Sequence, residues 1–176
     1  MLASFLRLHV LCAAATMAHA EKHQAPIVLT IARSDSGGGD GMQADLKTFE
    51  AHGVFGTTAV VALTAQNTKG VQAEEDMPLS IVHAQISSVL SDMGARVVKI
   101  GTLSTVKLIH AVNATLAKHR TAVHVIDPDV TADSNAMADS NEAVIEAIRD
   151  VLVPMATVLT PNVYEAGQLL GRAAPT

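Results

Sequence analysis

The 176-residue sequence has few aromatic residues, a single cysteine and no cluster of basic residues. Aromatic side chains make up 2% of the chain and apolar residues 49%, so a core must be built from Ala, Val, Leu and Ile. Such residues are typical of buried parallel strands covered by helices. The single cysteine, Cys12, excludes an internal disulfide and a metal site with several cysteine ligands. The net charge of −5 without a basic cluster argues against nucleic acid as a partner.

The eight histidines are mostly scattered along the chain and do not predict a metal site. His19 and His23 are four residues apart, but no further ligand follows in an obvious place. We therefore expect solvated surface histidines rather than a zinc site.

Residues 1–24 form an N-terminal extension with a pattern of its own. A mostly apolar run extends from Leu8 to Ala18, and the segment ends in the small-x-small pattern Ala18-His19-Ala20. This arrangement is typical of a secretory signal peptide. The run is too short and too polar for a membrane span, and no membrane association is expected. A start site further upstream or a loose helical extension would produce the same pattern.

Beyond Pro26, five β-type runs, most of them separated by helical patterns, predict one α/β domain over residues 25–176. We expect a mostly parallel sheet with helices on both faces and right-handed crossovers. The β-type runs are 27–31, 57–63, 97–100, 122–126 and 157–160, and the helical patterns are 42–52, 80–93, 105–119, 141–152 and 163–170. In the helical pattern 80–93, the residues expected on the buried face are Ile81, Ala84, Val89 and Met93.

Polar residues follow each of the five β-type runs. Because open α/β sheets bind ligands at the carboxyl ends of their strands, these residues predict one ligand crevice along one edge of the sheet. The segments concerned are 34–41, 64–68, 101–102, 127–135 and 161–162.

The glycine-rich turn 34–41 is the strongest local feature of the sequence. Its glycines allow backbone N–H groups to approach a ligand, and the following helix presents its positive end. No Gly-Lys-Ser/Thr closes the turn, so it is not a Walker loop. Residues 39–44 fit the dinucleotide pattern G-x-G-x-x-A, but the acidic residue expected about twenty positions later is missing, which argues against NAD.

Three polar positions each allow a functional and a purely local interpretation. The planar amide of Gln66 suits the edge of an aminopyrimidine, or it satisfies nearby backbone groups. Asn162 and Glu165 can orient Mg²⁺ with its water shell beside nucleotide phosphates, or they form a helix-capping box. Asp127 is either a second acid near the metal or a turn residue.

Taken together, these segments resemble the hydroxymethylpyrimidine/phosphomethylpyrimidine kinases of the ribokinase-like superfamily. The resemblance extends in family order from about Ile27 to Gly171. The segments with residues that match are 29–32, 34–39, 41–48, 62–68, 98–101, 127–128, 160–162 and 165–166. The blocks around the glycine turn and Gln66 are specific to these kinases, whereas the last three are shared with pyridoxal kinase relatives.

The resemblance implies a ribokinase-like three-layer α/β/α fold with a mostly parallel sheet, of which the C-terminal part is missing. It also implies transfer of the γ-phosphoryl group of ATP, with Mg²⁺, to hydroxymethylpyrimidine and then to its monophosphate in thiamine biosynthesis. The substrate residues that it implies are Gln66, Gly39, Asp40, Thr102 and Thr131. The residues implied for ATP are Asn162, Glu165 and Asp127, and those implied for the metal are Glu165 and Asp127.

The sequence also departs from the family pattern at positions that line the apolar part of the family's pyrimidine pocket. Gly, Ala, Met and an apolar residue are usual where this chain has Arg33, Asp40, Thr102 and Thr131. Asp129 stands in a stretch after Asp127-Pro128 that is normally apolar in the family. Because Arg33 and Asp40 flank one turn with opposite charges, we predict that they form a pair.

Family members continue with a Gly-Thr-Gly anion hole, its following catalytic residue and most of the adenine pocket. The 176 residues contain no such segment, so no catalytic residue is assigned. We therefore expect that this chain by itself does not phosphorylate hydroxymethylpyrimidine. The alternatives are a non-catalytic remnant that binds a pyrimidine and a relative of pyridoxal kinase. Dependence on nucleotide favours the cytoplasm over export, and the resemblance is compatible with a homodimer.

Overall fold

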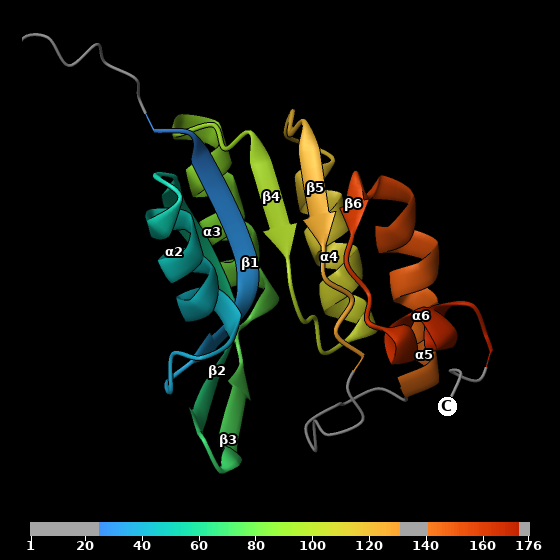
Figure 1. The fold of residues 1–176 in the computed structure, drawn as a ribbon. Coiled ribbons are helices and arrows are strands. Elements are labelled where there is room, and N and C mark those ends of the chain that lie inside the picture. The colour runs from blue at the N-terminus through green and yellow to red at the C-terminus, as the bar shows by residue number, and fades with distance from the viewer. Residues whose placement is uncertain (1–24, 131–140, 173–176) are drawn as a thin grey trace, which may run out of the picture.

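The computed structural model describes residues 25–130 and 141–172. Six strands form one sheet in the order β3-β2-β1-β4-β5-β6, and every neighbouring pair is parallel except β2 with β3. The strands are β1 (Ile27–Asp35), β2 (Phe55–Asn67), β3 (Gly70–Asp76), β4 (Val97–Ile100), β5 (Val123–Ile126) and β6 (Val158–Leu159). The mostly parallel α/β sheet predicted from the sequence is confirmed (Figure 1).

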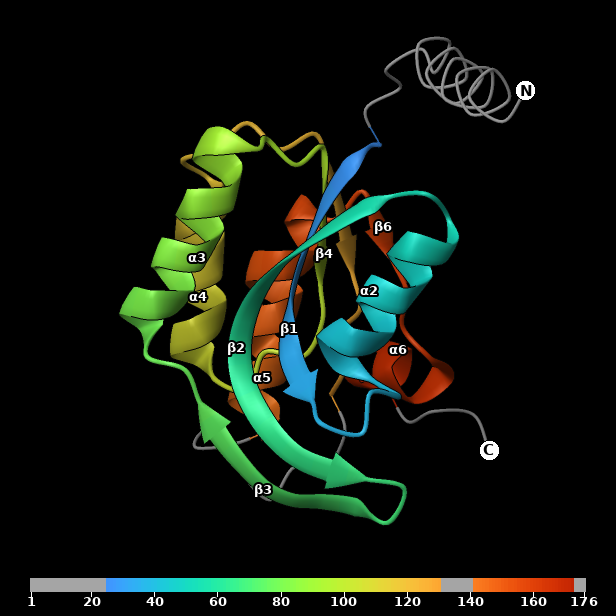
Figure 2. The ribbon, with the colours of Figure 1, turned by 90° about the vertical axis from the view of Figure 1, so that its left-hand side faces the viewer.

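Helices cover both faces of this sheet. Figure 2 shows α3 and α4 on one side of the strands and α2 and α6 on the other. The α-helices are α2 (Gly41–Ala51), α3 (Leu79–Asp92), α4 (Val106–Leu116), α5 (Asn141–Ala147) and α6 (Val163–Leu169). A π-helical turn, Ile148–Leu152, and a 3-10 turn, Val153–Met155, follow α5 directly. The helical pattern predicted for 141–152 is therefore α-helical only in its first half.

The core lies where the central strands meet the helices, and among the residues that the structure describes it contains no aromatic side chain. Leu29 and Ile31 of β1 are completely buried, as are Val98 and Ile100 of β4. Because β1 is covered on both faces, its sequence is a nearly continuous apolar run instead of an alternating one. This arrangement aligns the carboxyl ends of β1, β4 and β5 at one edge of the sheet.

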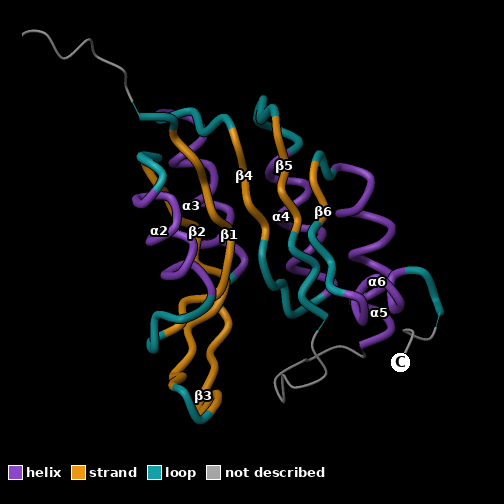
Figure 3. Tube along the Cα trace, viewed as in Figure 1, coloured by secondary structure: helices purple, strands orange, loops and turns teal. Residues whose placement is uncertain are grey.

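The sequence predicted five strands, and this number is wrong because β3 was missed. Most residues of β3 are exposed and three of its seven are acidic, so no buried face marks it as a strand. It pairs antiparallel with an extended β2, and Figure 3 shows the resulting hairpin projecting past the ends of β4 and β5. The hairpin brings Glu74 close to the carboxyl edge of the sheet.

The buried face predicted for the helical pattern 80–93 is also incorrect. Val82 and Ile86 of α3 are buried, whereas Ile81 and Met93 are largely exposed. Apolar residues occur on more than one side of this helix, so their spacing alone did not distinguish the two faces. None of the helices within 25–130 and 141–172 is both long and apolar enough to cross a membrane.

Candidate active site

A polar cavity of about 160 Å³ lies at the carboxyl edge of the sheet. Segments that are far apart in the sequence form its walls: the end of β1, the start of α2, the loops after β4 and β5, and α6. The lining residues are Ala32, Arg33, Asp40, Gly41, Lys99, Gly101, Thr102, Asp127, Asp129 and Glu165. The crevice predicted from the polar strand ends is thus present at this edge of the sheet.

Asp35 organises the glycine-rich turn beside this cavity. Its carboxylate accepts hydrogen bonds from the backbone N–H groups of Gly37 at 2.7 Å and of Gly39 and Asp40 at 2.9 Å each. Burial works against the charged form, but these backbone donors outweigh it and lower the pKa of Asp35. The N–H groups of Gly37, Gly39 and Asp40 therefore bind a carboxylate within the turn itself. Gly39 is not among the residues that line the cavity.

Arg33 extends into the cavity and joins three other polar residues. Its Nη1 contacts Glu74 Oε1 at 3.5 Å, and its Nη2 donates to Thr102 Oγ1 and Asp129 Oδ2 at 3.4 Å each. Thr102 Oγ1 donates in turn to Asp129 Oδ2 at 2.6 Å. The predicted ion pair between Arg33 and Asp40 is wrong, because the acidic partners of Arg33 are Glu74 and Asp129.

Asp40 lies at the N-terminus of α2 with an exposed side chain that caps none of the helix N–H groups. Its carboxylate lines the cavity from the side of the turn. Exposure to water removes the cost of an unpaired buried charge, so Asp40 does not need Arg33 as a partner.

Lys99 contributes the second cation of the cavity from the middle of β4. Its Nζ contacts Asp45 Oδ1 at 3.2 Å and Asp127 Oδ2 at 3.7 Å. Asp45 is held from behind by Thr30 Oγ1, which donates to its Oδ2 at 2.6 Å. Lys99 was not predicted as a site residue, although a lysine inside the apolar run 97–100 is a signal that could have identified it.

Asn162 and Glu165 form the capping box at the start of α6. Asn162 Oδ1 accepts from the N–H of Glu165 at 2.9 Å, and Glu165 Oε2 accepts from the N–H of Asn162 at 2.7 Å. Burial raises the pKa of Glu165; the hydrogen bond from Asn162 lowers it, and the charges of Asp129 and Asp127 raise it further. Glu165 thus closes a helix cap and also faces the other carboxylates of the cavity.

The remaining residues predicted for the site are distributed differently. Gln66 lies on the hairpin outside the cavity lining, where its N–H donates to Ser36 Oγ at 2.8 Å. Its Oε1 lies 3.4 Å from the hydroxyl of Thr64. Thr102 and Asp127 line the cavity as predicted, whereas Thr131 lies outside the described residues.

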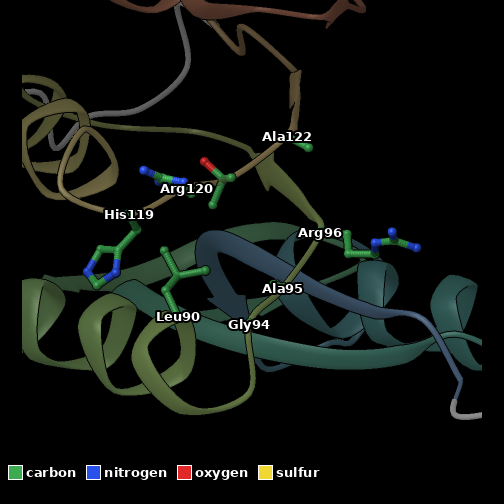
Figure 4. A pocket seen from close by; sticks show the side chains of 8 residues that line it. Leu90, Gly94, Ala95, Arg96, His119, Arg120 and Ala122 are labelled. Carbon is green, nitrogen blue, oxygen red and sulfur yellow. The ribbon is translucent and has the colours of Figure 1, made fainter.

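A second cavity, of about 190 Å³, lies at the opposite edge of the sheet between the end of α3 and the start of β5. Figure 4 shows Leu90 pointing toward the loop that carries His119 and Arg120, whereas the side chain of Arg96 extends away from them. Within the described part of the chain, no carboxylate lines this cavity. The predicted acidic residues Asp40, Asp127 and Glu165 lie at the carboxyl edge instead, together with Arg33 and Lys99.

Known proteins resemble the chain in both sequence and structure. Residues 35–176 match the model of the phosphomethylpyrimidine kinase family. The hydroxymethylpyrimidine/phosphomethylpyrimidine kinase of Streptomyces coelicolor is 46% identical over 147 residues, which is 83% of this chain and 54% of the relative. The chain therefore spans about half the length of the curated relatives it matches.

Two solved structures share the fold. The phosphomethylpyrimidine kinase of Clostridium difficile superimposes with a TM-score of 0.77 at 41% identity, covering 86% of this chain and 65% of that one. The pyridoxal kinase of Staphylococcus aureus, in complex with AMP-PCP and pyridoxal, gives a TM-score of 0.73 at 32% identity, covering 86% and 54%.

Proposed function

Because the chain belongs to the phosphomethylpyrimidine kinase family, we propose that residues 25–176 provide the substrate side of a kinase for hydroxymethylpyrimidine and its monophosphate. The reaction would use ATP with Mg²⁺ in thiamine biosynthesis, in the cytoplasm. The observation that carries this proposal is the cavity at the carboxyl edge of β1, β4 and β5. Open α/β sheets bind their ligands at that edge.

The chemistry of the cavity fits an alcohol that approaches a polyphosphate. Asp127 and Glu165 line one side, and Lys99 lies 3.7 Å from Asp127. Lys99 would keep the carboxylate of Asp127 turned toward the cavity while Asp45 holds Lys99 from the other side. In phosphoryl transfer, such groups act mostly by positioning and by balancing charge.

The carboxylates also fit Mg²⁺ held through its water shell. No group of three or more Asp, Glu, His or Cys side chains is placed to cage a metal among the residues that the structure describes. Mg²⁺ is usually held by one or two carboxylates together with substrate phosphates, and Asp127 and Glu165 supply that number. The pKa of Glu165 is raised in part by the charges of Asp127 and Asp129, so a cation would relieve this repulsion. When bound, the metal would neutralise phosphate charge.

Gln66 remains our proposed contact to the pyrimidine ring, together with Gly39, Asp40, Thr102 and Thr131. Gln66 is bound to the glycine turn through Ser36, whose Oγ donates to the carbonyl of Gln66 at 2.9 Å. This places the hairpin beside the turn that precedes Asp40. A ligand that reaches from the cavity toward the hairpin would meet the amide of Gln66. Asn162 would act at the phosphate side through its cap with Glu165.

A relative of pyridoxal kinase is the alternative, favoured by the structural likeness to the S. aureus enzyme. Calorimetric titration of the purified chain with hydroxymethylpyrimidine and, separately, with pyridoxal distinguishes the two. We expect saturable binding of hydroxymethylpyrimidine and weaker binding of pyridoxal. Tighter binding of pyridoxal would favour the alternative, and the absence of heat with either compound at millimolar concentration would contradict both.

A further inference from the structure

One wall of the cavity is an ion-paired network formed by Arg33, Thr102 and Asp129. These residues come from the end of β1 and from the loops after β4 and β5. Arg33 also reaches Glu74 of β3, so the network connects the hairpin to the body of the sheet. A ligand in the cavity would therefore lie against charged groups on this side.

These charges are largely withdrawn from water. The side-chain exposures of Arg33, Glu74 and Asp129 are 14%, 7% and 23%. An apolar group placed against them would remove their remaining water and return no hydrogen bond, which is unfavourable. A ligand group that donates or accepts hydrogen bonds would replace that water at little cost.

The balance of charge around the cavity favours a donor. Its lining contains four carboxylates, two from the loop after β5, one from the turn and one from α6, against the two cations Arg33 and Lys99. The carboxylate from the turn belongs to Asp40, whose side chain caps no helix N–H group. An amino group on a ligand would therefore be better accommodated than a methyl group of the same size.

We infer that Arg33, Thr102 and Asp129 are specificity-determining residues that select a pyrimidine alcohol carrying a hydrogen-bonding substituent, such as an amino group, in place of the ring methyl of hydroxymethylpyrimidine. The inference rests on the proposed function, because it takes the cavity to be the pyrimidine site. It narrows the substrate class to aminopyrimidine alcohols with a polar group in place of that methyl.

Two nearly isosteric probes test the inference by calorimetry on the full 176-residue chain. One is 4-amino-5-hydroxymethyl-2-methylpyrimidine, and the other is 2,4-diamino-5-hydroxymethylpyrimidine, which differs in a single substituent. We expect the unmodified chain to bind the diamino compound roughly tenfold more tightly, since a polar site discriminates against an analogue that lacks a hydrogen-bonding group.

Two substitutions assign this preference to the network. Thr102→Met and Asp129→Val each replace a polar wall residue with an apolar one, and each should bring the two affinities to within about twofold or reverse their order. Thr48→Met is the matched control, because Thr48 lies exposed on α2 and outside the cavity lining. It should keep the preference unchanged, and circular dichroism reports whether each variant is folded.

The outcomes separate the inference from the proposed function. If the unmodified chain binds the methyl compound equally well or better, the inference is overturned and the proposed function stands. A preference for the diamino compound that persists in both cavity variants also overturns it, because these residues would then not determine specificity. If neither probe binds to the unmodified chain or to any variant, the proposed function fails and the inference fails with it.

Discussion

At the scale of single residues, Arg33 connects the cavity to the hairpin through its ion pairs with Asp129 and Glu74. It is a mostly buried cation with two acidic partners, which pack against it from β3 and from the loop after β5. Removing one partner of a buried ion pair leaves the other charge without compensation, whereas exposed pairs contribute little to stability. Replacing the mostly buried Arg33 should therefore lower the free energy of unfolding more than replacing an exposed arginine.

We predict that Arg33→Met lowers the free energy of unfolding by about 3 kcal/mol, because the mostly buried ion pairs of Arg33 with Glu74 and Asp129 are lost. Arg149 supplies the control: it contacts Glu146 and Asp150, but its side chain is 41% exposed. Arg149→Met should cost less than about 1 kcal/mol. Urea unfolding measures both changes. Equal losses of unfolding free energy for the two substitutions would show that burial does not make the ion pairs of Arg33 more important for stability than the exposed ones of Arg149.

A double-mutant cycle of Arg33→Met with Asp129→Val checks the pairing itself. The cost of the double substitution should be clearly smaller than the sum of the two single costs, because each single substitution already removes the interaction between Arg33 and Asp129. Strictly additive costs would show that these two residues do not interact.

Gln66 can be tested without disturbing the fold. Gln66→Ala should weaken the binding of hydroxymethylpyrimidine roughly tenfold, because the ring edge loses a hydrogen-bonding partner. Gln72 is the matched control on the same hairpin, since its exposed amide donates to Asn67 and Gly70 of that hairpin. Calorimetry should show unchanged affinity in Gln72→Ala. Unchanged affinity in Gln66→Ala would remove Gln66 from the site.

Residue pairs could be predicted from the sequence only where they are local. Asn162 and Glu165 are three residues apart at a helix start, and the capping box, one of the two interpretations of this spacing, is present. Arg33 and Asp40 are also close in sequence, but Arg33 points from β1 toward β3 and the loop after β5. Spacing within a turn does not fix side-chain direction, so the partners of Arg33 depended on tertiary structure.

At the scale of elements, the turn between β1 and α2 depends on a glycine at its end. Gly41 has a φ of 55°, and an added Cβ would collide with the carbonyl oxygen of Arg33. Gly41→Ala should therefore destabilise the chain by more than about 2 kcal/mol, since strain and a backbone clash act together.

Gly53 is the matched control for this substitution. Its φ of 67° is similar, but nothing lies within 4 Å of an added Cβ. Gly53→Ala should cost about 1 kcal/mol from conformation alone. Urea unfolding compares the two, and equal losses would mean that the contact between Gly41 and Arg33 is not a constraint.

Glu165, in the cap of α6, should make the stability of the chain depend on pH. The pKa of Glu165 is raised above its ordinary value of 4.5, chiefly by burial. At pH values above 4.5 but below the raised pKa of the folded state, the folded chain holds a proton on Glu165 that the unfolded chain has released. The contribution of Glu165 to the free energy of unfolding therefore falls as the pH rises through this window. At neutral pH the ionised Glu165 therefore costs stability.

Glu165→Gln removes that charge and keeps an oxygen to accept from the N–H of Asn162. The variant should gain stability relative to the unmodified chain on going from pH 4 to pH 7, as measured by urea unfolding at both values. Other carboxyl groups, including Asp35, titrate in both proteins and cancel in the difference. A stability difference that does not change with pH would contradict the raised pKa.

The strands that the sequence predicted well are short runs of mostly apolar residues. The strands 97–100 and 122–126 were predicted within one residue of their bounds. The hairpin strand β3 was missed because exposed, acidic residues dominate it, and Glu74 was missed with it. Its position became visible only through pairing with β2.

At the scale of the whole molecule, the sheet order brings the functional side chains together. β1, β4 and β5 are neighbours, so the residues at their carboxyl ends meet although they are about 30 to 100 positions apart in sequence. The sequence predicted this crevice from the alternation of strands and helices. It did not predict the polar wall, since that wall needs the hairpin in place.

The most direct test of the account is hydrogen exchange of the full chain with and without hydroxymethylpyrimidine, because the two cavities lie at opposite edges of the sheet. We predict that the ligand slows exchange in the segments 32–41, 99–102 and 127–129, which surround the carboxyl-edge cavity. The segments 90–96 and 119–122 at the opposite edge should exchange as before. Protection confined to the opposite edge, or no protection at saturating ligand, would contradict the account.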